Sequence, residues 1–186
     1  MQAAGYVLVG GLSTRMGTDK ALLPFNGTTL MDFVASQVLE ATGNVTLVGN
    51  PSTYANRGYP VIADRLPGNG PLGGITAALA ASPCEWSLIT ACDMPKLTAD
   101  FLRRLLDTAF AAPGQPDCVV PETERGVEPL CAVYHARALP LLDSFLNHKF
   151  LKMQDAVHAL RSLRIPFADS ASFHNVNTPA DLNLHE

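Results

Sequence analysis

Two cations and several glycines stand in one loop that follows the first apolar run of the chain. The loop reads Gly10-Gly11-Leu12-Ser13-Thr14-Arg15-Met16-Gly17-Thr18-Asp19-Lys20. Adjacent glycines let backbone N–H groups approach a ligand closely, Ser13 adds a hydroxyl, and Arg15 and Lys20 supply positive charge. These residue types together predict a cradle for a triphosphate. The spacing fits neither the Walker A pattern nor G-x-G-x-x-G, and the alternative is an ordinary glycine turn with two solvated cations.

A carboxylate stands directly after another apolar run. Asp93 follows residues 86–91 (WSLITA) and Cys92, and Met94-Pro95 comes next. Hard oxygen ligands suit Mg²⁺, which usually takes one or two carboxylates together with substrate phosphates. Asp93 is therefore a candidate Mg²⁺ ligand, and the alternative is an aspartate that forms a turn or caps a helix.

Three further polar side chains are candidates for recognising flat heterocycles. Asp64 lies two residues past the short apolar pair at 61–62, and a carboxylate there can accept from guanine N1–H and N2–H₂ together. Asn175 and Asn177 occupy alternate positions, so both face one way if the chain is extended, and amides pair with ring donors and acceptors. The alternatives are a turn-forming aspartate and a helix-capping turn.

Residues 68–73 fit the pattern G-x-G-x-x-G, and Asp93 lies 20 residues after Gly73. That spacing is typical of a dinucleotide-binding fingerprint. Two features argue against it. Gly68 comes six residues after Ile62, the end of the preceding strand, and Pro71 lacks the N–H that a pyrophosphate would need. We interpret the segment as a second ligand-facing loop that opens a helix at Gly73-Gly74.

The pattern of apolar residues predicts the elements that must position these groups. Strands are expected at 5–9, 45–48, 61–62, 86–91, 118–121 and 130–134, with a short one near 165. Helices are expected at 30–41 (ended by Gly43), 75–81, 98–110 (capped by Thr98), 137–147 and 152–162. Strand and helix alternate up to residue 110, which predicts an α/β fold with right-handed crossovers and a mostly parallel, doubly covered sheet. Ligands bind such sheets at the carboxyl ends of the strands.

The composition narrows the possible classes of protein. The 186 residues suit one domain, and 47% hydrophobic residues are enough for a large core. A net charge of −4 argues against binding a nucleic-acid polymer. The charge-free run 66–84 holds three prolines and four glycines, so it cannot be a membrane helix. The N-terminus lacks the basic segment of a signal peptide, so we expect none. Four cysteines without a C-x-x-C pair predict buried thiols in a reducing cytoplasm.

These motifs, in this order, resemble those of the molybdenum cofactor guanylyltransferases. The likeness runs from about residue 5 to 184 and rests on five segments: residues 8–20, 70–74 (GPLGG), 92–95 (CDMP), 129–134 (PLCAVY) and 175–179 (NVNTP). The first segment alone is typical of the wider nucleotidyltransferase superfamily. The Asp19-Lys20 pair and the NVNTP segment favour this branch. Val9 departs from the family, which usually has alanine there.

The resemblance implies a Rossmann-like three-layer sandwich that forms one nucleotidyltransferase domain over residues 1–186. Residues 1–110 would bind the nucleotide and residues 111–186 the acceptor. The implied reaction transfers GMP from GTP to the molybdopterin-bound molybdenum cofactor and releases pyrophosphate, with Mg²⁺ as cofactor. The alternatives are a cytidylyl- or sugar-phosphate nucleotidylyltransferase and a non-catalytic GTP sensor on the same fold.

Residue roles follow from the same resemblance, matched motif by motif. The implied catalytic residues are Arg15, Lys20 and Asp93, with Asp93 also the metal ligand. The implied GTP-binding residues are Leu8, Val9, Gly10, Gly11, Ser13, Lys20, Asp64 and Asp93. The implied acceptor-binding residues are Gly70, Gly74, Asn175 and Asn177. The implied partners are GTP, a molybdopterin-type acceptor and transiently bound proteins of cofactor synthesis or use, in the cytoplasm and without a nucleic acid or a membrane.

Overall fold

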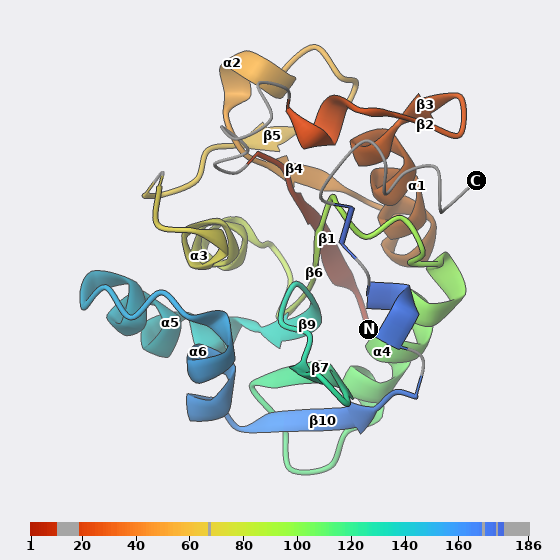
Figure 1. The fold of residues 1–186 in the computed structure, drawn as a ribbon. Helices are drawn as coiled ribbons and strands as arrows, with labels where there is room; N and C mark the ends of the chain where they lie inside the picture. Colours follow the sequence, from red (N-terminus) through yellow and green to blue (C-terminus); the bar gives the residue numbers. More distant parts are fainter. Residues whose placement is uncertain (11–18, 67, 169, 174, 177–186) are drawn as a thin grey trace.

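The computed structural model describes residues 1–10, 19–66, 68–168, 170–173 and 175–176 (Figure 1). One twisted sheet runs through the molecule in the order β10-β7-β9-β6-β1-β4-β5, and β8 pairs with β7. Its strands are β1 (Ala3–Leu8), β4 (Thr46–Val48), β5 (Val61–Ile62), β6 (Trp86–Ala91), β7 (Cys118–Thr123), β8 (Gly126–Val127), β9 (Cys131–His135) and β10 (Ser162–Pro166). Both halves of the chain therefore contribute to the same sheet.

Strand directions confirm the mostly parallel sheet, with one reversal. Strand β1 is parallel to β4 and β6, β4 to β5, and β7 to β10. Strand β9 lies antiparallel between β6 and β7. A parallel return from β7 would need a crossover of about a dozen residues or more, whereas the short β7–β8 hairpin brings the chain straight back. The reversal places the amino end of β9 beside the carboxyl end of β6.

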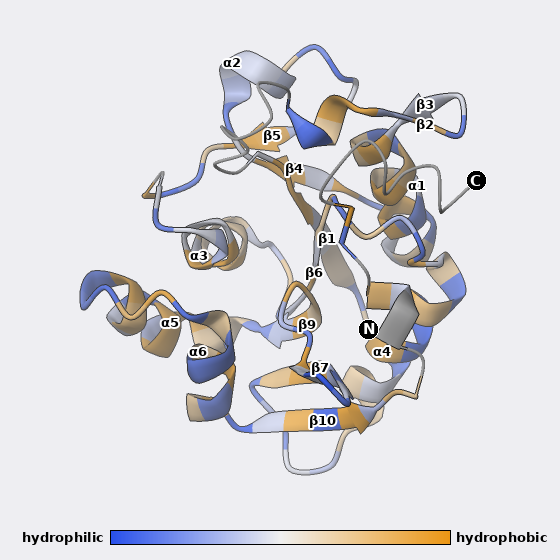
Figure 2. Ribbon diagram, viewed as in Figure 1, coloured by the Kyte–Doolittle hydropathy of each residue, from blue (hydrophilic) through white to orange (hydrophobic). Residues whose placement is uncertain are grey.

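Helices cover both faces of the sheet, which gives three layers (Figure 1). On one face α1 (Leu30–Thr42) packs against α4 (Ala99–Ala111), and on the other α3 (Pro71–Ala81) packs against α5 (Leu139–Asn147), with α6 (Met153–Ala159) beside them. Successive strand residues point to opposite faces, so Val7 joins the core under α1 while Leu8 joins the core under α3. Several strands of the sheet carry hydrophobic residues, which are orange in Figure 2. Within the described ranges, every helix is too short or too polar to cross a membrane.

Local signals set several helix ends. Helix α1 begins after Thr29, whose hydroxyl accepts from the Asp32 N–H at 3.2 Å, and it ends at Gly43 as predicted. Thr98 caps α4 by accepting from the Phe101 N–H at 3.3 Å, also as predicted. Helix α6 stops at Ala159, because the chain turns into β10 at Ser162, so the helix expected at 152–162 was too long.

Helix α3 corrects one prediction about the glycine-rich loop. It begins at Pro71, not at Gly73-Gly74, because proline is preorganised for the first helical position. Its N-cap, Gly70, has φ 65°, a conformation that favours glycine. The loop after β5 thus leads directly into a helix. The first argument against a dinucleotide fingerprint, that these glycines lie too far from the strand to belong to a strand-to-helix turn, was therefore wrong. The missing N–H of Pro71 still argues against a dinucleotide fingerprint.

Several short elements were not predicted from the sequence. A hairpin joins β2 (Pro24–Phe25) to β3 (Thr28–Thr29) through the turn Asn26-Gly27. The others are the two-residue strand β8, the helix α2 (Pro51–Tyr54) and the 3-10 turns η2 (Lys20–Leu22), η3 (Ala136–Ala138) and η4 (Ser170–Phe173). Two of them, η2 and α2, flank the candidate site.

Candidate active site

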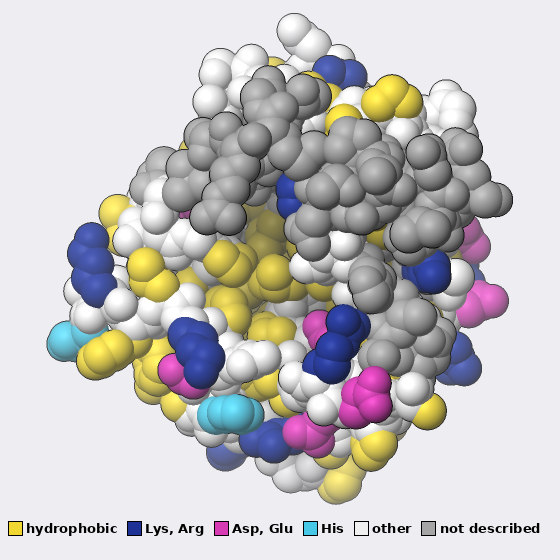
Figure 3. Space-filling model, in the orientation of Figure 1, with side chains coloured by type: hydrophobic (Ala, Val, Ile, Leu, Met, Phe, Trp, Pro, Cys, Tyr) yellow, Lys and Arg dark blue, Asp and Glu magenta, His cyan; other side chains and the backbone are white. Residues whose placement is uncertain are grey.

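The carboxyl ends of β1, β4, β5 and β6 open onto one cavity of about 810 Å³. Backbone hydrogen bonds hold these strand ends together: Val9 N–H donates to the Val48 carbonyl at 2.9 Å, and Cys92 N–H donates to the Leu8 carbonyl at 3.1 Å. The space-filling view shows the hollow and its apolar floor (Figure 3). Its volume is typical of a site for one small-molecule ligand.

The structure brings most of the predicted site residues to this cavity. Its walls include Leu8, Val9, Gly10, Lys20, Asp64, Gly70, Gly74 and Asp93. Asn175 lies instead on a second pocket of about 260 Å³, which shares Pro71 and Leu130 with the cavity. Gly11, Ser13, Arg15 and Asn177 lie outside the described residues. The roles assigned to all of these residues stay predictions.

Asp93 has the properties expected of a cation ligand. Its Oδ1 is buried and has no hydrogen-bond partner within the described part of the chain. Burial raises the pKa of the Asp93 carboxyl, and the nearby Lys20 ammonium opposes that rise. The Asp93 carbonyl accepts from the Val176 N–H at 2.9 Å, which holds the neighbour of Asn175 beside this strand end.

A divalent cation is the implied cofactor, and Asp93 fits it. A buried carboxylate oxygen that lacks a donor is suited to an ion, and Mg²⁺ completes its coordination with phosphate oxygens and water. Among the described residues, no group of three His, Cys, Asp or Glu side chains is arranged around a common metal position. Asp93 stays the candidate for a single protein carboxylate ligand.

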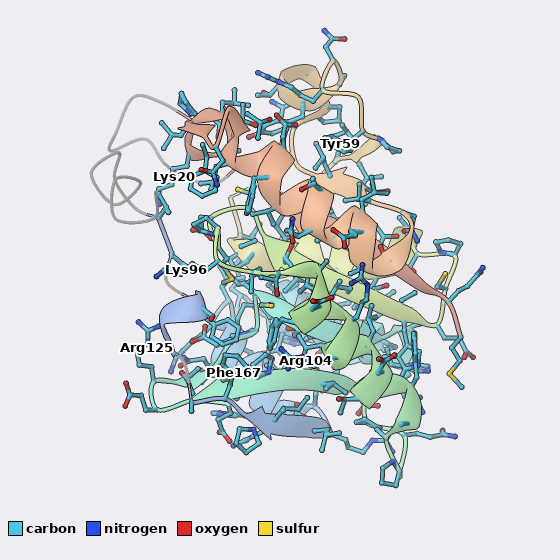
Figure 4. All side chains as sticks on the ribbon, turned by 90° about the vertical axis from the view of Figure 1, so that its right-hand side faces the viewer. Lys20, Tyr59, Lys96, Arg104, Arg125 and Phe167 are labelled. Atoms are coloured by element: carbon cyan, nitrogen blue, oxygen red, sulfur yellow. The ribbon has the colours of Figure 1, made fainter. Side chains whose placement is uncertain are left out.

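Lys20 is positioned by two neighbours that sequence reasoning missed. Asp19 caps the turn η2, because its Oδ1 accepts from the Ala21 N–H at 3.0 Å. The other oxygen, Oδ2, accepts from the Tyr54 hydroxyl at 2.5 Å. Tyr54 is 1% exposed, and burial together with the Asp19 carboxylate raises the pKa of its hydroxyl, which keeps it a donor. Figure 4 shows Lys20 on the same side of the molecule as Lys96 and Arg125.

Asp64 does two things at once. Its Oδ1 accepts from the Leu66 N–H at 2.9 Å, as expected of a turn-forming aspartate. The carboxylate also lies on the cavity wall, pressed against the first turn of α3, where a Cβ on Gly73 would overlap Oδ1. The glycine at position 73 therefore makes room for the Asp64 carboxylate at the cavity.

Two more cavity residues follow β4. Asn50 lies on the cavity and caps α2, because its Oδ1 accepts from the Ser52 N–H at 3.0 Å. Oδ1 is already an acceptor in the cap. The amide nitrogen of Asn50 is therefore the atom that is left to contact a ligand, as a donor. The dipeptide Asn50-Pro51, which begins two residues after the predicted strand 45–48, is a turn signal that could have pointed here. Gly49 is required by close packing, because a Cβ there would overlap the Val9 carbonyl and Cγ2.

Comparisons with known proteins agree with this geometry. The family described as "MobA-like NTP transferase domain" matches residues 5–163. The chain is 35% identical to a probable molybdenum cofactor guanylyltransferase of Deinococcus radiodurans, over 95% of the chain and 90% of the relative. It is 32% identical to the molybdenum cofactor guanylyltransferase of Cupriavidus metallidurans, over 98% of the chain and 93% of the relative.

Solved structures show the same fold. The molybdopterin-guanine dinucleotide biosynthesis protein A of Archaeoglobus fulgidus has a TM-score of 0.82 and 26% identity, covering 98% of this chain and 96% of that one. A CMP:2-keto-3-deoxy-manno-octonic acid synthetase shares the fold alone, with a TM-score of 0.75 and 12% identity over 100% of this chain and 97% of that one. The matched family covers most of the sequence, and the named relatives are similar over nearly their full length. The chain belongs to the family of MobA-like NTP transferases.

Proposed function

We propose that the chain transfers GMP from GTP to the phosphate of the molybdopterin-bound molybdenum cofactor and releases pyrophosphate. The product is the guanine dinucleotide form of the cofactor. The observation that carries this proposal is the cavity at the strand ends, which gathers a cation (Lys20), a buried carboxylate without a donor (Asp93) and a carboxylate suited to guanine (Asp64). The names of the curated relatives supply the acceptor.

The triphosphate would lie between the loop after β1 and the turn η2. Lys20 and the backbone of Gly10 line the cavity there, and the sequence adds Gly11, Ser13 and Arg15 to the same loop. Leu8 and Val9 would contact the nucleoside, and the Asp64 carboxylate would accept from the guanine N1–H and N2–H₂ donors.

The chemistry needs positioning and positive charge more than a base. The attacking group is a phosphate oxygen that is already anionic, so no proton has to be removed. A bond forms between this oxygen and the α-phosphorus, and the bond from the α-phosphorus to the pyrophosphate oxygen breaks. Lys20 and Arg15 would hold the pyrophosphate as its charge grows. When bound at Asp93, Mg²⁺ supplies further positive charge to the phosphates.

The acceptor would enter from the smaller pocket. Its phosphate must reach the α-phosphorus, and the two pockets meet at Pro71 and Leu130. Gly70 and Gly74 lie on the larger cavity near this boundary, and Asn175 lies on the smaller pocket. Residues 111–186 would thus supply most of the acceptor side and residues 1–110 most of the nucleotide side, with Pro71, Met94 and Leu130 crossing that division. The four cysteines form no disulfide, which supports a cytoplasmic reaction.

The decisive experiment measures pyrophosphate release with GTP, Mg²⁺ and molybdopterin. Release that requires all three components supports guanylyl transfer. Stabilisation by GTP without any release would favour the non-catalytic sensor. A thermal-shift comparison of GTP, CTP, ATP and UTP separates the remaining alternatives, because a cytidylyl- or sugar-phosphate nucleotidylyltransferase would prefer another nucleotide.

A further inference from the structure

The smaller pocket carries one carboxylate that the proposed nucleotide site does not use. The pocket, of about 260 Å³, is lined by Pro71, Met94, Val127, Glu128, Pro129, Leu130, Leu151, Lys152, Met153, Gln154 and Asn175. Among these lining residues Glu128 alone carries an acidic side chain. Most of the others are apolar, and Met94 and Met153 are 2% and 7% exposed. Pockets for whole small-molecule ligands typically have about 300–1,000 Å³, so this pocket suits a ring system.

The backbone around Glu128 is well fixed. Its N–H donates to the Pro121 carbonyl at 2.9 Å, and its carbonyl accepts from the Cys131 N–H at 3.1 Å. These bonds tie the residue to β7 and to the start of β9. The Glu128 side chain therefore extends from a fixed backbone, next to the end of β6.

The Glu128 carboxylate has little hydrogen bonding of its own. Its Oε1 accepts from the Thr123 hydroxyl at 3.4 Å, and that hydroxyl also lies 3.3 Å from the Gly126 carbonyl. One hydroxyl proton can serve only one of these acceptors, while an ionised carboxylate offers about four lone-pair sites. Partial burial raises the pKa of Glu128, and Arg125 and Thr123 oppose that rise. Among the residues that the structure describes, the group is short of donors.

We propose that Glu128 recognises the pyrimidine edge of the acceptor's pterin ring in this pocket, an inference that rests on the proposed function. A pterin presents a ring N3–H and an exocyclic 2-amino group side by side. A carboxylate can accept from both donors in parallel, and such charge-assisted pairs are about twice as strong as neutral hydrogen bonds. The bicyclic ring would lie among the apolar side chains, and its phosphate-bearing arm would extend past Pro71 and Leu130 toward Asp93.

The test compares two ring systems and two variants. Pterin (2-amino-4-oxopteridine) and lumazine (2,4-dioxopteridine) differ at position 2, where lumazine replaces the amino donor by a carbonyl acceptor. Binding of each is followed by its fluorescence, with the protein saturated with GTP so that the guanine site is occupied. We expect wild type to prefer pterin by about tenfold or more, and Glu128→Gln to lose that preference. The matched control is Glu124→Gln, because Glu124 is exposed on the same hairpin.

The outcomes separate this inference from the proposed function. Equal affinity of wild type for pterin and lumazine overturns the inference without any variant, and so does a preference that Glu128→Gln retains. If Glu128→Gln fails to fold in a melting curve, Glu128→Asp replaces it, and an undiminished preference in that shorter acid overturns the contact. Guanylyl transfer to molybdopterin by wild type would stand in each of these cases. A wild type that releases no pyrophosphate would contradict the proposed function instead.

Discussion

Replacing the Asp93 carboxylate by an amide should stabilise the unliganded protein while it removes activity. Asp93 Oδ1 is buried without a hydrogen-bond partner in the described part of the chain, and burial raises the pKa of the carboxyl in the folded state. A buried polar group without a partner costs about 1–3 kcal/mol, and a charged one more. Asp93→Asn keeps the shape and an unpartnered polar group but removes the charge, so only the extra cost of the charge is recovered, and we expect the free energy of unfolding at neutral pH to rise by about 1 kcal/mol.

The pH dependence gives this prediction a sign that can be checked. When folding raises the pKa of an acid, the folded state is most stable at low pH, where the acid is protonated. That stability is lost as the pH rises through the folded-state pKa. The advantage of Asp93→Asn should therefore be present at neutral pH and vanish below about pH 4, the ordinary pKa of aspartate. For a chain of this length, 1 kcal/mol corresponds to about 2–4 °C in Tm.

The assay pairs melting curves with steady-state pyrophosphate release at fixed Mg²⁺. Charge stabilisation by a metal ion contributes several kcal/mol to catalysis, so turnover should fall by about 10³ or more. The control is Asp107→Asn, which makes the same charge change on the exposed face of α4 and should alter neither quantity. A lower Tm of Asp93→Asn at neutral pH would mean that the carboxylate supports the fold, and unchanged turnover would remove it from the metal site.

Three further predictions test the cavity. Lys20→Ala and Arg15→Ala should each lower kcat by about 10²–10³, measured by steady-state kinetics, with a double mutant less than additive because both cations serve one triphosphate; wild-type kcat in either would make it an ordinary solvated cation. Thermal shift should show a preference for GTP over ATP of at least about tenfold, and equal stabilisation would contradict guanine recognition. Tyr54→Phe removes the donor to Asp19 and should lower the free energy of unfolding by about 1.5–3 kcal/mol in denaturant titrations and raise the GTP KM; Tyr59→Phe is the control.

The elements governed by local signals were predictable from the sequence. Thr98 and Gly43 mark a helix start and a helix end by capping, a property of the residue and its immediate neighbours. The order of strand and helix up to residue 110 indicated where the strand ends would meet, and hence that Asp64 and Asp93 share a cavity. The Asn26-Gly27 turn signal was equally local, but its flanking strands are only two residues long and carry little pattern.

Features that depend on distant contacts were not predictable. Tyr54 and Asp19 are 35 residues apart in the chain, and no sequence motif links the two residues. The direction of β9 follows from how the hairpin returns the chain and not from its apolar pattern, which is the same for both directions. The missing hydrogen-bond partner of Asp93 Oδ1 is a property of the folded surroundings, whereas the sequence shows only that an aspartate follows a strand.

The reversed strand β9 also sets the hairpin before it apart from the parallel strands whose ends line the larger cavity. Because β9 runs against β6, with Cys131 opposite Thr90, the hairpin before it reaches the cavity edge from the side. Residues at the ends of β1, β4 and β6 line the larger cavity, and Leu130 at the end of this hairpin segment lines it too. Substitutions in residues 124–129 should therefore alter the smaller pocket, which Val127, Glu128 and Pro129 line, more than the larger cavity. Exchanging this hairpin between relatives is therefore a way to vary the smaller pocket while the ends of β1, β4 and β6 stay unchanged.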